Sequence, residues 1–194
     1  MKLKALSLLD IEHVRKWRNS QMEMLRTSFP LTQKMQEQFY HDVVSNRQAN
    51  ARYWGIWIDA ERLVDVLSNN KITRNNLIGM AGIENIQWEN RLGEISLLLI
   101  PGGMRKYGTK ALKLLLHEVF MNMNMDNIYT EVYTCNPHLP FWMDITGEYN
   151  TCFVRLPNRK YYNGEYWPSY YININKEDYL EHENTISQSA QTFS

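Results

Sequence analysis

The sequence has little cysteine, no excess charge of either sign and no long apolar run. Its 194 residues include 2 cysteines, Cys135 and Cys152, too few for a disulfide framework or a zinc site. Lys and Arg total 21 and Asp and Glu total 21, so the basic excess typical of nucleic-acid-binding proteins is missing. No apolar run approaches the ~18 residues that a membrane-spanning helix needs. We therefore expect a cytoplasmic protein with reduced thiols, no metal, and neither a membrane nor a nucleic acid as partner.

The length predicts a single domain. Of the residues, 44% are hydrophobic, which is enough to bury a core without cross-links. We place this domain at residues 1–181 and expect the Ser-, Gln- and Thr-rich residues 182–194 to form a disordered tail. Tyr and Trp crowd the last third of the chain, where they offer contact area for a core, a ligand pocket or a homodimer interface.

Hydrophobic periodicity predicts an α/β fold built on a mixed sheet. The order of elements is β-α-α-β-β-β-α-β-α-β-β, which combines hairpins with one strand–loop–helix crossover. A long hairpin connection is expected over residues 60–76. The predicted strands cover 3–7, 53–58, 77–87, 94–100, 127–134, 149–156 and 166–174, and the predicted helices start near Asp10, Thr32 and Thr109, with a loop or short helix over 137–145.

The strand–loop–helix over residues 94–120 is the most suggestive segment. A helix opening at 107–109 would present unpartnered backbone amides and the positive end of its dipole, a combination that suits phosphate or pyrophosphate. Gly108 would let a ligand approach the backbone, and Arg105 and Lys106 would add positive charge. The alternative is a glycine-containing turn with solvated charges before an ordinary helix. A Walker loop is excluded, because no Gly-Lys-Ser/Thr follows at the required spacing.

The segment Tyr107-Gly-Thr-Lys-Ala-Leu-Lys-Leu-Leu-Leu116 resembles the acetyl-CoA loop and helix of the GNAT N-acetyltransferase superfamily. The family pattern there is Arg/Gln-x-x-Gly-x-Gly/Ala. Gly108 matches its second glycine, but Lys106 stands at the first glycine and Gly103 at the Arg/Gln, so Arg105 is the candidate substitute. Further segments resemble the branch of ribosomal-protein N-terminal and amino-sugar acetyltransferases, so that the likeness covers about residues 3–180. They are residues 10–19, 77–82, 94–100, 131–137 and 159–167.

The resemblance implies a fold and a co-substrate. The fold is a mixed β-sheet flanked by helices, with splayed central strands between which acetyl-CoA binds. The pantetheine arm would pair with the backbone of Leu98, Leu99 and Ile100 as an added strand does. Asn136 would contact the pantetheine, although an Asn before Pro137 is also an ordinary turn former. The pyrophosphate region would involve Met104, Arg105, Lys106, Tyr107, Gly108 and Thr109.

The implied reaction is direct attack of an amine on the thioester, which needs a base and benefits from an acid. Glu131 is the leading base, with Glu84, or Glu94, acting through a water as alternatives; each can equally be a structural residue. The family usually places a tyrosine six to seven residues after the Asn matched here by Asn136, but this chain has Trp142 and Met143 there. The candidate replacements for the acid are Tyr133, Tyr107 and Tyr149.

The region between the first two helices would line the acceptor site. By resemblance, Arg18, Arg26 and Phe29 would contact an acidic or aromatic acceptor. The predicted activity is therefore that of an acyltransferase, an acetyl-CoA-dependent N-acetyltransferase acting on a primary amine: an amino sugar, a protein N-terminus or a small amine. The alternative is an acyl-CoA-binding interaction module without catalysis, for which Lys106 and Trp142 are the supporting features.

Overall fold

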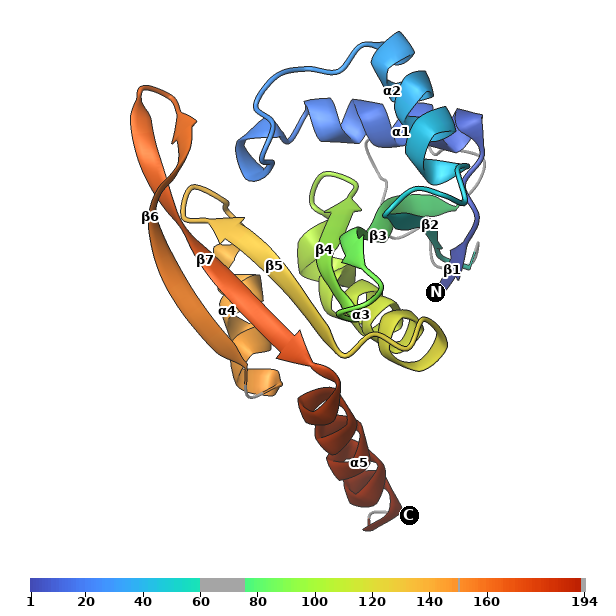
Figure 1. Ribbon diagram of the computed structural model, residues 1–194, viewed down its shortest axis with the longest axis vertical. Helices are drawn as coiled ribbons and strands as arrows, with labels where there is room; N and C mark the ends of the chain where they lie inside the picture. Colours follow the sequence, from blue (N-terminus) through green and yellow to red (C-terminus); the bar gives the residue numbers. More distant parts are fainter. Residues whose placement is uncertain (60–75, 150, 193–194) are drawn as a thin grey trace.

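The computed structural model describes residues 1–59, 76–149 and 151–192 (Figure 1). The predicted connection over residues 60–76 lies, apart from Asn76, outside the described residues. The strands are β1 (Lys2–Lys4), β2 (Arg52–Trp57), β3 (Leu77–Gln87), β4 (Leu92–Leu99), β5 (Asn127–Tyr133), β6 (Cys152–Tyr162) and β7 (Glu165–Asn175). The helices are α1 (Leu8–Asn19), α2 (Gln33–Phe39), α3 (Gly103–His117), α4 (Leu139–Glu148) and α5 (Lys176–Thr192), with shorter turns η1 (Met22–Met24), η2 (Tyr40–Val44) and η4 (Glu118–Asn122).

The strands form one mixed sheet in the order β1-β2-β3-β4-β5-β7-β6. Neighbouring strands are antiparallel except β4 and β5, which are parallel. These two pair only at Leu92↔Asn127, Gly93↔Ile128 and Glu94↔Tyr129. Beyond Glu94 each strand continues without pairing to the other, so the centre of the sheet is open toward the end of β4 (Figure 1). The expected splayed central strands are confirmed.

Helices cover both faces of the sheet (Figure 1). On one face α1 packs Ile11 and Val14 against Leu77, Met80 and Leu98. On the other face the apolar side of α3, including Ala111, Leu112 and Leu115, lies in the main core. The periodicity that predicts these helices also gives their buried faces, because the inward side chains recur every three to four residues.

The helix α1 begins earlier than predicted because Ser7 caps it. The Ser7 side chain accepts a hydrogen bond from the backbone amide of Asp10, and the Asp10 carboxylate accepts one from the backbone amide of Ser7 at 2.8 Å. This reciprocal cap starts the helix at Leu8.

The start of α3 is a larger correction. The helix begins at Gly103, not at 107–109, and the preceding Gly102 has a φ of +76°, in the left-handed region that favours glycine. The amide of Gly103 donates to the carbonyl of Ile100 at 2.8 Å, which closes the turn. Arg105 and Lys106 are therefore exposed residues of the first helical turn rather than loop residues.

The C-terminal segment also differs from the prediction. Residues 182–192 belong to helix α5 and are not a disordered tail. The Asn175 side chain accepts a hydrogen bond from the amide of Asp178 at 2.8 Å, and Tyr179 packs on Phe120 with ring centroids 5.1 Å apart. The amphipathic pattern of this polar helix is weak, and its composition therefore predicts disorder. In the structure, the Asn175 cap and the buried side chain of Tyr179 hold the start of the helix in place. Among the described residues, no helix is long and apolar enough to cross a membrane.

Candidate active site

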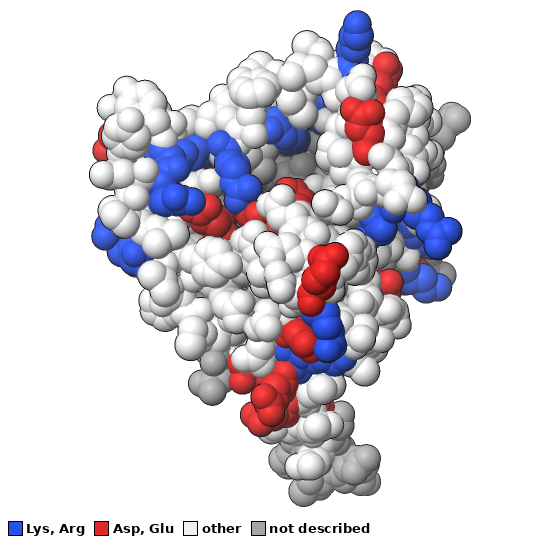
Figure 2. Space-filling model, in the orientation of Figure 1, with Lys and Arg blue, Asp and Glu red and all other residues white. Residues whose placement is uncertain are grey.

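A cavity of about 590 Å³ lies between the layer formed by α1, η1 and α2 and the strands β3, β4 and β5. It extends to the opening between β4 and β5. Figure 2 shows this face of the molecule hollowed below the α1–α2 layer, with basic and acidic side chains gathered along the hollow. The volume is in the range of small-molecule sites.

Three carboxylates lie at one end of this cavity. Glu84 of β3 pairs directly across the sheet with Glu94 of β4, so the two side chains share a face. Glu131 of β5 lies on the other side of the opening, and all three residues line the cavity. Like charges opposite each other in a sheet are destabilising, so each carboxylate needs a partner.

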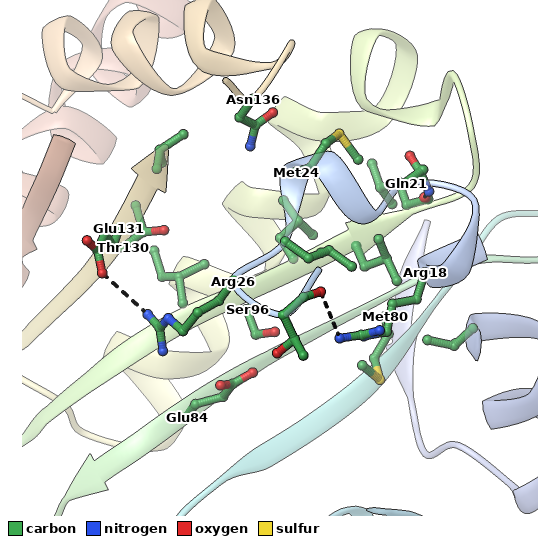
Figure 3. A pocket seen from close by; sticks show the side chains of 18 of the residues that line it. Arg18, Gln21, Met24, Arg26, Met80, Glu84, Ser96, Thr130, Glu131 and Asn136 are labelled. Carbon is green, nitrogen blue, oxygen red and sulfur yellow. Dashed lines mark hydrogen bonds and ion pairs between the residues drawn. The ribbon is translucent and has the colours of Figure 1, made fainter. Parts of the chain in front are cut away.

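Arg26 supplies that partner for two of the three carboxylates. Its guanidinium is hydrogen-bonded to Glu94, and its Nη2 lies 3.7 Å from Oε2 of Glu131 (Figure 3). Burial alone would lower the pKa of Arg26, but the hydrogen bonds with Glu94 and Tyr133 outweigh it and the pKa is raised. Asn85 Nδ2 also donates to Glu94 at 2.8 Å. Glu94, at the last position where β4 pairs with β5, thus has two side-chain partners.

Glu131, the leading base candidate, is engaged as well. Arg159 Nε donates to its Oε1 at 2.8 Å and Ser169 Oγ at 2.7 Å. Burial raises the pKa of Glu131, but these two hydrogen bonds and the nearby arginine charges outweigh it, so the pKa lies below its ordinary value. A carboxylate held in this way is a weaker base than a free one.

Glu84 has a different environment. The hydroxyl of Tyr53 donates a hydrogen bond to it, and burial together with the Glu84 charge raises the pKa of Tyr53. Within the described residues, no Lys, Arg or His lies within ion-pair distance of Glu84. Of the three carboxylates, Glu84 alone keeps its charge uncompensated.

Of the three tyrosines considered as an acid, Tyr133 is the one that lines the cavity. It is buried, its hydroxyl accepts a hydrogen bond from Arg26 Nε at 3.3 Å, and burial raises its pKa. The hydroxyls of Tyr107 and Tyr149 are buried and have no hydrogen-bond partner among the described residues. Trp142, at the position where the family usually has a tyrosine, is buried and also lines the cavity.

The predicted coenzyme residues fall into two groups. Leu98, Leu99, Met104 and Asn136 line the cavity, and Ile100 follows the end of β4, where its amide donates to Ile78. The side chain of Asn136 accepts a hydrogen bond from the amide of His138 at 2.8 Å, which is the turn-forming contact. The second group lies on α3 outside the cavity lining: Arg105, Lys106 and Thr109 are exposed, whereas Tyr107 and Gly108 are buried.

Close packing around Gly108 explains why a glycine stands at this position. A Cβ atom there would lie 2.7 Å from Met104 Sδ and 3.1 Å from Phe141 Cε2, so the missing side chain lets α4 approach α3. Because α3 begins at Gly103, its amides without intrahelical partners include those of Met104 and Arg105, whereas the amide of Lys106 is the first that can bond within the helix. The free amides expected at 107–109 therefore lie about one turn earlier, next to the end of β4.

Arg18 and Phe29 both line the cavity at its other end. Arg18 Nη1 donates to the carbonyl of Phe29 at 3.3 Å and Nη2 to that of Thr27 at 3.5 Å, while the Phe29 side chain is exposed. Figure 3 shows Arg18 at one end of the drawn cavity and Arg26 with Glu131 at the other, with Ser96 between them.

Sequence reasoning missed three residues that shape this site. Gln21 Nε2 donates to the carbonyls of Leu99 and Trp17 at 2.9 and 3.1 Å and so ties α1 to β4. Gln36 is buried against the cavity, and its Oε1 has no hydrogen-bond partner among the described residues. Lys160 of β6 is buried and donates to the carbonyls of Glu23 and Leu25 at 2.6 and 2.7 Å. No local pattern identifies Gln21 as a contact of β4 or Lys160 as a contact of η1, because Leu99 lies 78 residues from Gln21 and Glu23 lies 137 residues from Lys160.

Three comparisons with known proteins bear on the site. The sequence profile of the family described as "Acetyltransferase (GNAT) domain" matches residues 1–138. No curated protein matches the chain.

Within the described residues, no group of three His, Cys, Asp or Glu side chains is placed to hold a metal ion.

Solved structures of SpeG from Vibrio cholerae have the same fold. Mutant forms of this spermidine/spermine N-acetyltransferase match with a TM-score of 0.73 at 20% identity, over 94% of this chain and 97% of that one. A spermidine N-acetyltransferase in complex with CoA and spermine matches with a TM-score of 0.72 at 19% identity, over 92% and 97%. A manganese complex matches with a TM-score of 0.70 at 20% identity, over 93% and 95%. At these identities the likeness shows the fold.

The open β4–β5 pair, the free amides at the start of α3 and the cavity between them fit acetyl-CoA, the co-substrate of GNAT enzymes. The family match covers well over half of the chain. The protein therefore belongs to the GNAT acetyltransferase family and is an acetyl-CoA-dependent N-acetyltransferase.

Proposed function

We propose that the protein acetylates the primary amine of a small molecule bound in this cavity, with Glu84 as the general base. The observation that carries the proposal is the contrast among the three carboxylates. Glu94 and Glu131 are held by arginines, whereas Glu84 has only the Tyr53 hydroxyl as its partner within the described residues. Glu84 is the carboxylate that remains available to accept a proton.

The reaction requires one proton to leave the ammonium group before attack. Glu84, directly or through one water, takes this proton; the amine nitrogen then bonds to the thioester carbon, the carbon–sulfur bond breaks, and CoA leaves as a thiolate. Tyr133 supports the last step. This residue lines the cavity and its hydroxyl is protonated, although the pKa raised by burial makes it a weaker acid than a free tyrosine, and the thiolate takes its proton from this hydroxyl or from solvent.

The coenzyme would lie along the open edge of β4. We propose that the end of β4, from Leu98 to Ile100, pairs with the pantetheine arm through the backbone groups that β3 and Gln21 leave free, and that the amides of Met104 and Arg105 bind the pyrophosphate. Asn136 would contact the arm from the β5 side. This assignment leaves the other end of β4, near Glu94 and Ser96, for the acetyl group.

A small acceptor suits the cavity better than a protein N-terminus. A volume of about 590 Å³ holds a compact ligand together with the acetyl end of the coenzyme. The solved neighbours are spermidine and spermine acetyltransferases, so polyamines are one class to test. Amino sugars are the other class, which the aromatic side chains Phe29 and Phe39 in the cavity lining would suit.

The proposal is tested by measuring the release of the CoA thiol from acetyl-CoA with spermidine, glucosamine, glucosamine 6-phosphate and a tripeptide as acceptors. Glu84→Gln is expected to lower kcat about 100-fold or more, the usual effect of removing a general base. Glu89→Gln, an exposed substitution in the β3–β4 turn, is the matched control and should change kcat little. Calorimetric binding of acetyl-CoA without acceptor-dependent thiol release would favour the interaction module instead.

A further inference from the structure

We infer that Arg18 forms an anion-binding subsite at the end of the cavity opposite Glu84, and that the acceptor is a primary amine carrying a phosphate or carboxylate group. This inference rests on the proposed function and names the class of acceptor for that same site. It makes Arg18 a specificity-determining residue of the reaction.

The first argument is that Arg18 has no counter-ion. It is half-buried and lines the cavity, and within the described residues no carboxylate lies within ion-pair distance of it. Its hydrogen bonds to the carbonyls of Phe29 and Thr27 are long, at 3.3 and 3.5 Å. Burial lowers its pKa, as expected for a charge that is desolvated without compensation. A guanidinium in this state binds a phosphate or carboxylate favourably, because both can accept its N–H donors in pairs.

The second argument comes from the neighbouring cations. Arg15, one turn earlier on α1, forms two hydrogen bonds with Glu12 at 2.6 and 2.7 Å and a third with the carbonyl of Leu31. Arg26 contacts both Glu94 and Glu131. Among the residues that the structure describes, the arginines on either side therefore have carboxylate partners, and Arg18, inside the cavity, has none.

The third argument is the arrangement of charge along the cavity. Figure 3 places Arg18 and the Arg26–Glu131 pair at opposite ends, with Ser96 between them. A ligand with its amine near Glu84 and an anionic group on Arg18 would match this polarity. A polyamine extending along the same path would place a second ammonium group against Arg18, which is repulsive.

The test compares matched acceptors at saturating acetyl-CoA. The pairs are glucosamine 6-phosphate with glucosamine, and 4-aminobutanoate with 1,4-diaminobutane. For at least one pair, the kcat/KM of the wild type is expected to be about tenfold or more higher for the anionic acceptor. A factor of this size corresponds to the free energy of a hydrogen bond to a charged group. The phosphate pair and the carboxylate pair separately identify which anion is preferred.

The variants assign the preference to Arg18. Arg18→Gln should abolish it mainly by raising KM, while Arg18→Lys, which keeps the charge, should retain part of it. Arg15→Gln is the matched control, because Arg15 also bonds a carbonyl of the same loop but lies outside the cavity lining, and its preference should equal that of the wild type. Equal use of both members of each pair, or a preference unchanged in both Arg18 variants, would overturn the inference.

A binding measurement separates this inference from the proposed function. Glucosamine 6-phosphate and 4-aminobutanoate are titrated by calorimetry into the CoA-saturated protein, so that the amides at the start of α3 are already occupied. If no amine is acetylated, the proposed function fails. The subsite is still supported if one anionic probe binds the wild type and binds Arg18→Gln about tenfold more weakly. Binding of neither anionic probe, or equal binding to both proteins, would contradict it.

Discussion

The two ends of the cavity use arginine in opposite ways. At the β4–β5 opening, Arg26 joins Glu94 and Glu131, and Arg159 adds a further bond to Glu131. At the α1 end, the hydrogen bonds that Arg18 makes within the described part of the chain go to the backbone carbonyls of Phe29 and Thr27, at distances that indicate weak bonds. The same residue type thus serves internal charge compensation at one end and offers an unsatisfied charge at the other.

This difference teaches how to separate structural from functional charges in a pocket. A buried charge with partners supplied by the chain is costly to remove and does little for a ligand. A charge without such partners costs little to remove and has its binding capacity unused. By this criterion we propose Glu84 and Arg18 as the functional charges, and Glu131 and Arg26 as charges that hold the opening in shape.

The largest expected effect separates the two base candidates. Glu84→Gln should lower kcat by about 100-fold or more, whereas Glu131→Gln should lower it less than about tenfold, because only Glu84 lacks an arginine partner. Steady-state kinetics with one acceptor measure both variants. A greater fall in kcat for Glu131→Gln than for Glu84→Gln would indicate that Glu131 is the base. It would also contradict the distinction between charges with and without arginine partners.

The next effect is on stability. Arg26→Met leaves Glu94 and Glu131 without the cation that they share. We expect the free energy of unfolding to fall by about 3 kcal/mol. This value is at the low end for the loss of an ion-pair partner, because the Arg26 side chain is 53% exposed. Arg18→Met should change the free energy of unfolding by less than about 0.5 kcal/mol. Urea unfolding of both variants gives the two values. Similar losses for both would show that Arg18 is not the less compensated cation.

A smaller loss is expected at Lys160. Lys160→Met leaves the carbonyls of Glu23 and Leu25 without their donor, and we expect a cost of about 1–2 kcal/mol for these buried groups. The η1 turn precedes Arg26, so Lys160 acts as a positioning residue for the carboxylate end. Urea unfolding gives the cost, and a rise in KM larger than the fall in kcat would be the kinetic sign. An unchanged stability would mean that water replaces the lysine.

The smallest effect is a pH dependence. The pKa of Glu131 is lowered from 4.5 in the folded protein, so its contribution to stability is present above pH 4.5 and is lost as the pH falls through the folded-state value. Arg159→Gln removes one bond that lowers this pKa. The variant should therefore be less stable than the wild type at pH 7, and the difference should vanish in acid. Urea midpoints across this range test it, and a difference that persists in acid would point to another cause.

Much of the fold was predictable because its signals are local. The spacing of Ile11, Val14, Ala111 and Leu115 predicts the helices and their buried faces, and Asn163-Gly164, a residue pair that favours tight turns, closes the last hairpin with both residues at positive φ. The opening between β4 and β5 was predicted from the resemblance to the GNAT superfamily. The start of α3 differs from the prediction because Gly102, with its positive φ, turns the chain from β4 directly into the helix, which leaves no loop before residues 107–109.

Part of the cavity lining was predictable as a set of residues, but the network of contacts was not. Glu84, Glu131, Tyr133, Arg18 and Phe29 line the cavity, whereas five of the residues expected at the pyrophosphate do not: Arg105, Lys106, Tyr107, Gly108 and Thr109. The hydrogen-bond partners of the two carboxylates and the tyrosine lie far along the chain: Tyr53 is 31 residues from Glu84, Arg159 is 28 from Glu131, and Arg26 is 107 from Tyr133. Only the folded arrangement shows which carboxylate has an arginine partner, and that information moves the base assignment from Glu131 to Glu84.

The measurement that tests the account most directly is the division of kinetic effects between Glu84→Gln and Arg18→Gln, with glucosamine 6-phosphate or the best anionic acceptor. The account predicts that Glu84→Gln lowers kcat about 100-fold with little change in KM, and that Arg18→Gln raises KM about tenfold with little change in kcat. Effects of both variants on the same kinetic parameter, or no effect of Glu84→Gln on kcat, would contradict it.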